Sequence, residues 1–201
     1  MNAEKPLPLA GLISAAGLSS RMGAFKPLLP FGEGTIISRC VENMRLAGAE
    51  KVLIVTGHRA DEIKAQSALC GCSFVHNPGY AENQMFDSLC IGLKELEGKC
   101  SRVIISPVDV PAVKAETVRA LIGEKADVVR PLYEGRSGHP IVLDAKCIDS
   151  VLSYKGEGGL RGAIEKLGLE VREIECDDAG VCIDADRPED YELLKKIGES
   201  L

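Results

Sequence analysis

Short apolar runs alternate with amphipathic stretches along this chain. The runs at residues 52–55 and 103–105 are apolar throughout, which is typical of parallel strands that helices cover on both faces. Other stretches repeat apolar residues every three or four positions, as the buried face of a helix does. One such row consists of Met85, Leu89, Leu93 and Leu96. The alternation of the two patterns predicts an α/β fold built on a doubly wound, mostly parallel sheet with helices on both faces.

The patterns also give the order of the predicted elements. Strands are expected at residues 9–14, 51–56, 73–76, 102–106, 127–131 and 169–174. Helices are expected at residues 35–47, 60–69, 84–96, 115–122, 145–152 and 160–167, and from residue 188 onward. A Gly-rich loop at residues 135–138 precedes a short apolar run at residues 141–143. Because no stretch has the composition of a linker, we expect a single domain over residues 1–201.

Charge and composition argue against two classes of partner. The 201 residues include 30 acidic side chains and 24 Lys and Arg, which gives a net charge of −6. Nucleic acids and anionic membranes attract basic surfaces, so we expect neither as a partner. Aromatic residues make up only 4% of the chain, which disfavours platforms for stacked bases. No uncharged run reaches the roughly 18 apolar residues of a membrane span.

The cysteines and the N-terminal segment predict a soluble protein of the cytoplasm. The eight cysteines are scattered without C-x-x-C spacing and there are three histidines, so we expect neither a disulfide framework nor a zinc site. Residues 7–18 superficially resemble a secretory leader, but Pro8, Gly11 and Gly17 interrupt them. A buried strand that runs into a functional loop explains this segment better.

The first motif with chemical potential follows the first predicted strand. Residues 15–23 read AAGLSSRMG, and Lys26 comes three positions later. Small residues allow the backbone to approach an anion closely, while Arg21 and Lys26 supply positive charge, so the motif predicts a phosphate-binding loop. It is not a Walker loop, because Pro27 follows the lysine where that loop requires Ser or Thr.

Carboxylates near two other predicted element ends suggest a metal site. Asp109 follows the strand predicted at residues 102–106, where a carboxylate is well placed to hold Mg²⁺. Ligands of open α/β sheets bind beyond the carboxyl ends of the strands, so Asp109 and the phosphate loop are expected to meet. Asp184 and Asp186 precede the last helix. They either complete the metal site or favour the N-terminus of that helix.

Two histidine-containing segments are less informative by themselves. Gly138-His139-Pro140 lies in the Gly-rich loop, and His76-Asn77-Pro78 follows a predicted strand. A lone histidine before proline is usually a loop residue, so neither segment alone predicts catalysis. Acyl transfer is not expected, because the chain has no G-x-S-x-G motif.

Together these segments resemble the nucleotidyltransferases with a Rossmann-like fold. The loop at residues 15–23 and the segment at residues 26–29 carry that likeness, which continues in order at residues 55–59, 76–80, 108–111, 138–141 and 183–190. Within this group the chain most resembles the molybdenum cofactor cytidylyltransferases, because Gly138-His139-Pro140 accompanies the shared loop.

The resemblance implies transfer of CMP from CTP to the terminal phosphate of a molybdenum-bearing molybdopterin, with release of pyrophosphate. Implied catalytic residues are Lys26, Arg21 and Asp109. Implied nucleotide-binding residues are Ala15, Ala16, Gly17, Arg21, Lys26, Thr56 and Ser88. Asp109 and Asp186 are implied ligands of Mg²⁺, with Mn²⁺ as the alternative ion. Implied acceptor-binding residues are His139, Asn77 and Asp184, and a molybdoenzyme or its chaperone is the implied protein partner.

Two departures from the family pattern affect these expectations. The chain has one extra residue between Tyr80 and Ser88, with Asn83 where a glycine is common, which weakens the inference for Ser88. Asn tolerates the left-handed conformation that such a turn needs. Arg187 stands where a helix-capping threonine is usual, so Asp186 is an alternative cap for the last helix.

The sequence leaves the acceptor open. The same loop and metal site serve transfer to a sugar phosphate or an alcohol phosphate, and a noncatalytic nucleotide- or cofactor-binding module is a further alternative. We expect residues 1 to about 110 to form the nucleotide half of the fold and the remainder to form the acceptor half.

Overall fold

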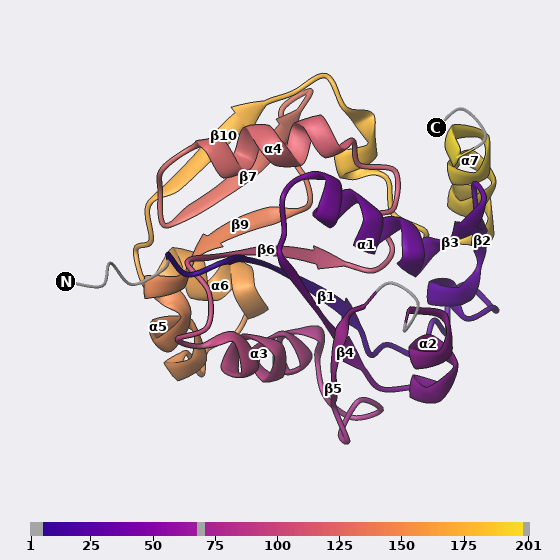
Figure 1. The fold of residues 1–201 in the computed structure, drawn as a ribbon, viewed down its shortest axis with the longest axis horizontal. Helices are drawn as coiled ribbons and strands as arrows, with labels where there is room; N and C mark the ends of the chain where they lie inside the picture. The colour runs from indigo at the N-terminus through magenta and orange to yellow at the C-terminus, as the bar shows by residue number, and fades with distance from the viewer. Residues whose placement is uncertain (1–5, 68–70, 199–201) are drawn as a thin grey trace.

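The computed structural model describes residues 6–67 and 71–198 of the chain. Its centre is a sheet with the strand order β10-β7-β9-β6-β1-β4-β5, and β8 pairs with β7 (Figure 1). The strands are β1 (Leu9–Ala15), β4 (Lys51–Thr56), β5 (Ser73–His76), β6 (Arg102–Pro107), β7 (Val128–Tyr133), β8 (Arg136–Ser137), β9 (Ile141–Asp144) and β10 (Val171–Glu175).

Most of this sheet is parallel, as the continuous apolar runs predicted. β6, β1, β4 and β5 are parallel neighbours, and β10 is parallel to β7. β9 is antiparallel to both β6 and β7, and the short β8 is antiparallel to β7. The apolar run at residues 141–143 predicted no strand direction, because a strand buried on both faces has the same composition in either orientation.

Helices cover both faces of the sheet (Figure 1). The helices of the described chain are α1 (Ile36–Leu46), α2 (Ala60–Ser67), α3 (Met85–Leu96), α4 (Ala115–Gly123), α5 (Ile148–Ser153), α6 (Gly159–Lys166) and α7 (Pro188–Gly198), of which α7 packs on β2 (Pro30–Phe31) beside the central sheet. Short 3-10 turns are η1 (Lys26–Leu28), η3 (Ala145–Cys147) and η4 (Ala179–Cys182). Among these, α1 and α4 pack over one face, whereas α3, α5 and α6 pack over the other.

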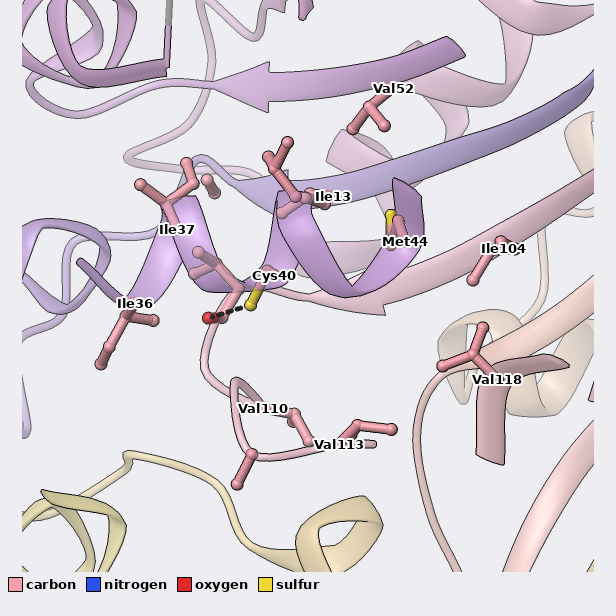
Figure 2. Packing of buried hydrophobic residues seen from close by; sticks show 14 of the residues in the cluster. Ile13, Ile36, Ile37, Cys40, Met44, Val52, Ile104, Val110, Val113 and Val118 are labelled. Atoms are coloured by element: carbon pink, nitrogen blue, oxygen red, sulfur yellow. Dashed lines mark hydrogen bonds between the residues drawn. The ribbon is translucent and has the colours of Figure 1, made fainter. Parts of the chain in front are cut away.

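The alternation of side chains along each central strand separates the two cores. In β1, Ile13 belongs to the cluster beneath α1, and Leu12 belongs to the cluster beneath α3. Figure 2 shows Cys40 and Met44 of α1 in the first cluster, with the Cys40 thiol donating a hydrogen bond to the carbonyl of Val108 at 3.4 Å. Burial raises the pKa of this thiol, which therefore acts as a small apolar side chain.

A glycine in α3 allows that helix to lie close to the sheet. A Cβ atom on Gly92 would stand 2.4 Å from Cδ1 of Leu12 and 2.8 Å from Cγ2 of Val55. Real Cβ atoms do not approach other atoms so closely, so the packing of α3 on β1 and β4 depends on glycine here. This packing brings the N-terminus of α3 to the carboxyl ends of the strands.

The remaining differences from the predicted elements are local. The predicted helix at residues 60–69 is confirmed as α2 through Ser67, and its last two predicted residues lie outside the described ranges. The strands β2 (Pro30–Phe31) and β3 (Gly34–Thr35) form an antiparallel pair that was not predicted, because two-residue strands leave no periodic pattern. Within the described ranges, no helix is both long and apolar enough to cross a membrane.

Candidate active site

A cavity of about 250 Å³ opens at the carboxyl ends of β1 and β6. From β1 the chain builds β4 and β5 on one side of that strand and then returns to β6 on its other side. Ligands in open α/β sheets bind at such a switch in strand order. The walls come from the loop after β1, the start of α3, the end of β6 and the segment before α7.

The loop after β1 folds back to place Lys26 at the cavity. The backbone N–H of Lys26 donates to the hydroxyl of Ser19 at 3.1 Å, and the N–H of Met22 donates to the Ser19 carbonyl at 3.1 Å. Ser19 itself has a φ of 55°, which is uncommon for a residue other than glycine. Pro27 suits the first turn of η1, because its ring fixes the backbone there. Ser19 is thus a structural residue that the sequence analysis did not single out.

Four charged side chains meet at the mouth of the cavity. The Nζ atom of Lys26 lies 2.5 Å from Oδ1 of Asp186 and 3.1 Å from Oδ2 of Asp109. The Nη1 atom of Arg21 lies 2.5 Å from the other oxygen of Asp186. Lys26 is only 8% exposed, whereas the Arg21 side chain is largely in solvent. A buried ammonium requires opposite charge close by, and the two aspartates provide it.

This arrangement keeps Lys26 and Asp186 ionised. Burial disfavours the charged form of Lys26, but the hydrogen bonds and attraction of Asp186 and Asp109 outweigh it and raise the lysine pKa. The hydrogen bond from Lys26 lowers the pKa of Asp186. Asp184 differs, because burial and repulsion from Asp109 and Asp186 raise its pKa. The cavity therefore has one lysine that stays protonated and a neighbouring aspartate that stays negative near neutral pH.

The segment before α7 is fastened to the loop after β6. The N–H of Ala185 donates to the carbonyl of Asp109 at 2.9 Å, which fixes Asp186 opposite that residue. Further back, the buried Asp178 accepts hydrogen bonds from Thr117 Oγ1 at 2.6 Å and from the backbone N–H of Lys114 at 2.9 Å. Asp178 was missed in the sequence, where nothing distinguishes it from an exposed loop aspartate.

The first turn of α7 is capped by Asp190 and not by Asp186, the alternative cap suggested by the sequence. The backbone N–H of Arg187 donates to Oδ2 of Asp190 at 3.0 Å. Asp190 thus satisfies a donor at this helix start, while both carboxylate oxygens of Asp186 pair with Lys26 and Arg21. Although Arg187 stands where related sequences usually have threonine, Asp186 is not needed as a cap and its carboxylate lies at the cavity.

Asp109 and Asp186 are the candidate ligands for a divalent cation. Within the described residues, no three side chains of His, Cys, Asp or Glu are grouped as a metal site. Mg²⁺ commonly takes only one or two protein carboxylates and completes its coordination with water and substrate phosphates. Two carboxylates that converge on one ammonium therefore fit a cation that arrives with a triphosphate.

The comparison with family models decides to which family the chain belongs. The model for the MobA-like NTP transferase domain matches residues 11–171, which include the phosphate loop and Asp109. The chain belongs to this family. This confirms the resemblance found in the sequence, and the protein is a nucleotidyltransferase with the expected α/β fold.

Two of the relatives match this NTP transferase over nearly its whole length. The molybdenum cofactor cytidylyltransferase of Escherichia coli K12 is 28% identical over 187 residues, which cover 92% of this chain and 94% of that protein. The nicotine blue oxidoreductase of Paenarthrobacter nicotinovorans is 29% identical over 198 residues, with coverage of 92% and 96%.

Solved structures share the same fold. The crystal structure of Rv0371c from Mycobacterium tuberculosis H37Rv superimposes with a TM-score of 0.80 at 25% identity, covering 96% of this chain and all of the other. A structure of that mycobacterial protein in complex with manganese gives a TM-score of 0.78 at 22% identity, with coverage of 96% and 100%.

The structure brings most of the predicted nucleotide and metal residues of the NTP transferase together. The cavity is lined by Ala15, Ala16, Gly17, Arg21, Lys26, Ser88, Asp109 and Asp186. Thr56 and Asn77 are fully buried and do not line it. Thr56 instead donates from its hydroxyl to the carbonyl of Val75 at 3.3 Å. Their binding roles, like the other assigned roles, stay predictions.

Other wall residues were not predicted from the sequence. They include Tyr80, Asn83, Gln84 and Met85, which lie between β5 and the first turn of α3. The one sequence feature that could have pointed to these residues is Gly57, which follows β4. A Cβ atom there would stand 2.5 Å from Cβ of Tyr80 and 2.6 Å from the carbonyl oxygen of Ala16. Glycine at this position allows the loops after β1, β4 and β5 to converge.

Neither His139 nor Asp184 lines the 250 Å³ cavity, but the charge of Asp109, which does line it, affects the pKa of both. His139 is exposed to solvent, yet neighbouring protein atoms still disfavour its protonated form and lower its pKa, with Asp109 acting in the opposite direction. The backbone N–H of His139 donates to the carbonyl of Val181 at 2.9 Å. His139 is therefore attached to the same segment that carries Asp186.

Gly138 makes this attachment possible and supplies a first prediction. A Cβ atom on Gly138 would stand 2.4 Å from the carbonyl oxygen of Val181, which is backbone and cannot rotate away. We expect Gly138→Ala to destabilise the fold by about 1–3 kcal/mol, because overpacking forces the segment before α7 outward. Urea unfolding followed by circular dichroism measures the change.

The matched control for this prediction is Gly123→Ala at the end of α4. A Cβ atom there meets no other atom within 4 Å, so its free energy of unfolding should stay within about 0.5 kcal/mol of the wild type. Equal stability of the Gly138→Ala and Gly123→Ala variants would contradict the packing argument.

Proposed function

We propose that this NTP transferase moves CMP from CTP to the terminal phosphate of a molybdopterin-type acceptor and releases pyrophosphate. The observation that carries the proposal is the cluster of Lys26, Asp109 and Asp186 at the switch-point cavity. The full-length similarity to a molybdenum cofactor cytidylyltransferase supports the choice of nucleotide and acceptor.

The charges of the cavity suit a nucleoside triphosphate that binds together with a cation. Lys26 and Arg21 at present neutralise Asp109 and Asp186. Phosphate oxygens would compete for the two basic side chains, and a divalent ion would compete for the two carboxylates. The two exchanges compensate each other, so binding of the complete pair leaves no buried charge unopposed.

The reaction needs no general base from the protein. A phosphate monoester has a second pKa near 6 and is mostly a dianion at neutral pH, so an acceptor phosphate oxygen can attack directly. A bond forms between that oxygen and the α-phosphorus, and the bond from the α-phosphorus to the bridging oxygen breaks. Pyrophosphate leaves with the electron pair of the broken bond.

The side chains of the cavity act by position and charge. Lys26 would neutralise the negative charge that develops on the phosphoryl oxygens, and Arg21 would bind the triphosphate from the exposed side. Asp109 and Asp186 would hold Mg²⁺ or Mn²⁺, which supplies further charge neutralisation when bound. Residues after about 110 would form most of the acceptor side, although Asp186 from that half completes the nucleotide cavity.

The test measures pyrophosphate release with CTP or GTP and Mg²⁺, in the presence and absence of molybdopterin. We expect release with CTP only when molybdopterin is present, together with a CMP adduct detected by mass spectrometry. Preference for GTP, or turnover of a sugar phosphate or alcohol phosphate instead, would contradict the proposed substrates. CTP binding without turnover of any acceptor would favour a noncatalytic module.

One relative requires a separate control for a second activity. Because an oxidoreductase is 29% identical over 92% of this chain, the same preparation is assayed for oxidation of NADH and NADPH with quinonoid dyes. We expect no dye-dependent oxidation above the protein-free rate. Oxidation that is faster than any nucleotidyl transfer would replace the proposed function.

A further inference from the structure

A buried asparagine lies directly behind the cavity wall. Asn77 follows the last residue of β5 and is completely inaccessible to solvent. Its Nδ2 atom lies 2.9 Å from the hydroxyl oxygen of Ser88, which is 5% exposed and lines the cavity from the first turn of α3. Asn77 therefore contacts the binding site through Ser88 on one side and through Asn83, another wall residue, on the other.

The surroundings of Asn77 fix which way its amide points. The backbone N–H of Gly79, which can only donate, lies 2.9 Å from Oδ1 of Asn77. The side-chain amide of Asn83 donates to the same oxygen at 3.3 Å. The carbonyl end of the Asn77 amide is thus occupied by two donors, and its NH₂ group must face Ser88.

The backbone holds this amide in place. The N–H of Asn77 donates to the carbonyl of Thr56 at 2.8 Å, which anchors the loop after β5 to the end of β4. Asn83 replaces the glycine that the family pattern favours, but its φ is not positive, so the turn needs no left-handed residue there. The Asn83 side chain, which a glycine would lack, contributes a hydrogen bond to Asn77 and so supports the contact with Ser88.

The hydrogen bond from Asn77 determines where the single proton of the Ser88 hydroxyl can point. Its oxygen already accepts a hydrogen bond from Asn77, and within residues 6–67 and 71–198 no protein acceptor receives its proton. We propose that Asn77 is a positioning residue that makes Ser88 a hydrogen-bond donor toward the nucleotide. The inference rests on the proposed nucleotide binding, and it assigns to Ser88 a partner atom that accepts, such as a carbonyl, ring nitrogen or ribose oxygen.

The substitution Asn77→Asp tests the direction of this hydrogen bond. A carboxylate keeps an acceptor for Gly79 and Asn83, but it presents a second acceptor to Ser88 and draws the hydroxyl proton away from the cavity. We expect KM for CTP to rise about threefold to tenfold, as loss of one neutral hydrogen bond does, with a smaller change in kcat. Ser88→Ala should give a rise of similar size.

A double-mutant cycle separates positioning from general damage to the fold. If Asn77 acts through Ser88, Asn77→Asp adds little to the KM of a protein that already carries Ser88→Ala. The matched control is Asn43→Asp, the same change at a buried asparagine that donates to the carbonyls of Pro111 and Val113. Because Asn43 does not contact Ser88, the fold-change in KM of the Asn43→Asp, Ser88→Ala double variant should equal the product of the two single fold-changes.

The dissociation constant of CTP, measured by calorimetry without an acceptor, extends the cycle to binding alone. Should Asn77→Asp fail to fold, Asn77→Ala replaces it in the cycle, because it removes the donor without burying a charge. Multiplicative effects of the Asn77 and Ser88 substitutions on the dissociation constant would overturn the inference. Nonadditive effects would support it even if molybdopterin proves not to be the acceptor, and absence of CTP binding by the wild type would overturn both proposals.

Discussion

Replacement of Lys26 by alanine is expected to lower kcat for nucleotidyl transfer by about a hundredfold or more, the usual effect of removing one preorganised contact to the transition state. The ammonium of Lys26 is the buried positive charge on which Asp109 and Asp186 converge. Its removal leaves developing phosphoryl charge uncompensated and allows the two carboxylates to repel an incoming triphosphate. Pyrophosphate release at saturating CTP measures the loss.

Two further variants separate the charge of Lys26 from its packing. Lys26→Met retains most of the side-chain volume and should lose as much activity as Lys26→Ala, because neither carries a charge. Lys166→Ala, at the exposed end of α6, removes a lysine far from the cavity and should retain the wild-type rate. A nearly unchanged kcat in Lys26→Met would refute the electrostatic role of this lysine.

The second large effect is expected from Asp109→Ala. We expect kcat to fall by about a hundredfold or more, and the Mg²⁺ concentration that gives half-maximal rate to rise, because one of two candidate metal ligands is lost. Steady-state rates over a Mg²⁺ titration, repeated with Mn²⁺, measure both changes.

The control for this prediction uses an aspartate of similar chemistry in another place. Asp149→Ala removes an exposed carboxylate in the first turn of α5 and should leave the Mg²⁺ dependence unchanged. If Asp109→Ala lowered kcat without altering the Mg²⁺ dependence, Asp109 would serve to hold Lys26, and the metal site would have to be sought elsewhere. A normal kcat in Asp109→Ala would eliminate both roles.

The sequence was sufficient to predict the strands and helices whose residue pattern is local. The apolar runs predicted β1, β4 and β6 within one residue at each end, and the row from Met85 to Leu96 predicted α3. The reversed direction of β9 depends on pairing with strands that are distant in the chain, and no local pattern records it. The same applies to β2 and β3, which are too short to be periodic.

The candidate site was predictable where composition alone carries the chemistry. Small residues with Arg21 and Lys26 after a buried strand predict an anion loop whatever the tertiary structure. The directions of side chains near strand ends are a different matter, because a shift of one residue turns a side chain to the opposite face. Thr56 and Asn77 illustrate this, since both stand at the expected strand ends and yet point into the protein.

The pairing of Lys26 with Asp186 joins residues 160 positions apart. During synthesis the phosphate loop and β1 are made early, but Asp186, one of the two carboxylates that neutralise Lys26, is made only with the segment before α7. The family model matches residues 11–171, which end before that segment. A nascent chain that stops after residue 171 would therefore contain the whole of that match and still lack the Asp186 carboxylate that pairs with Lys26.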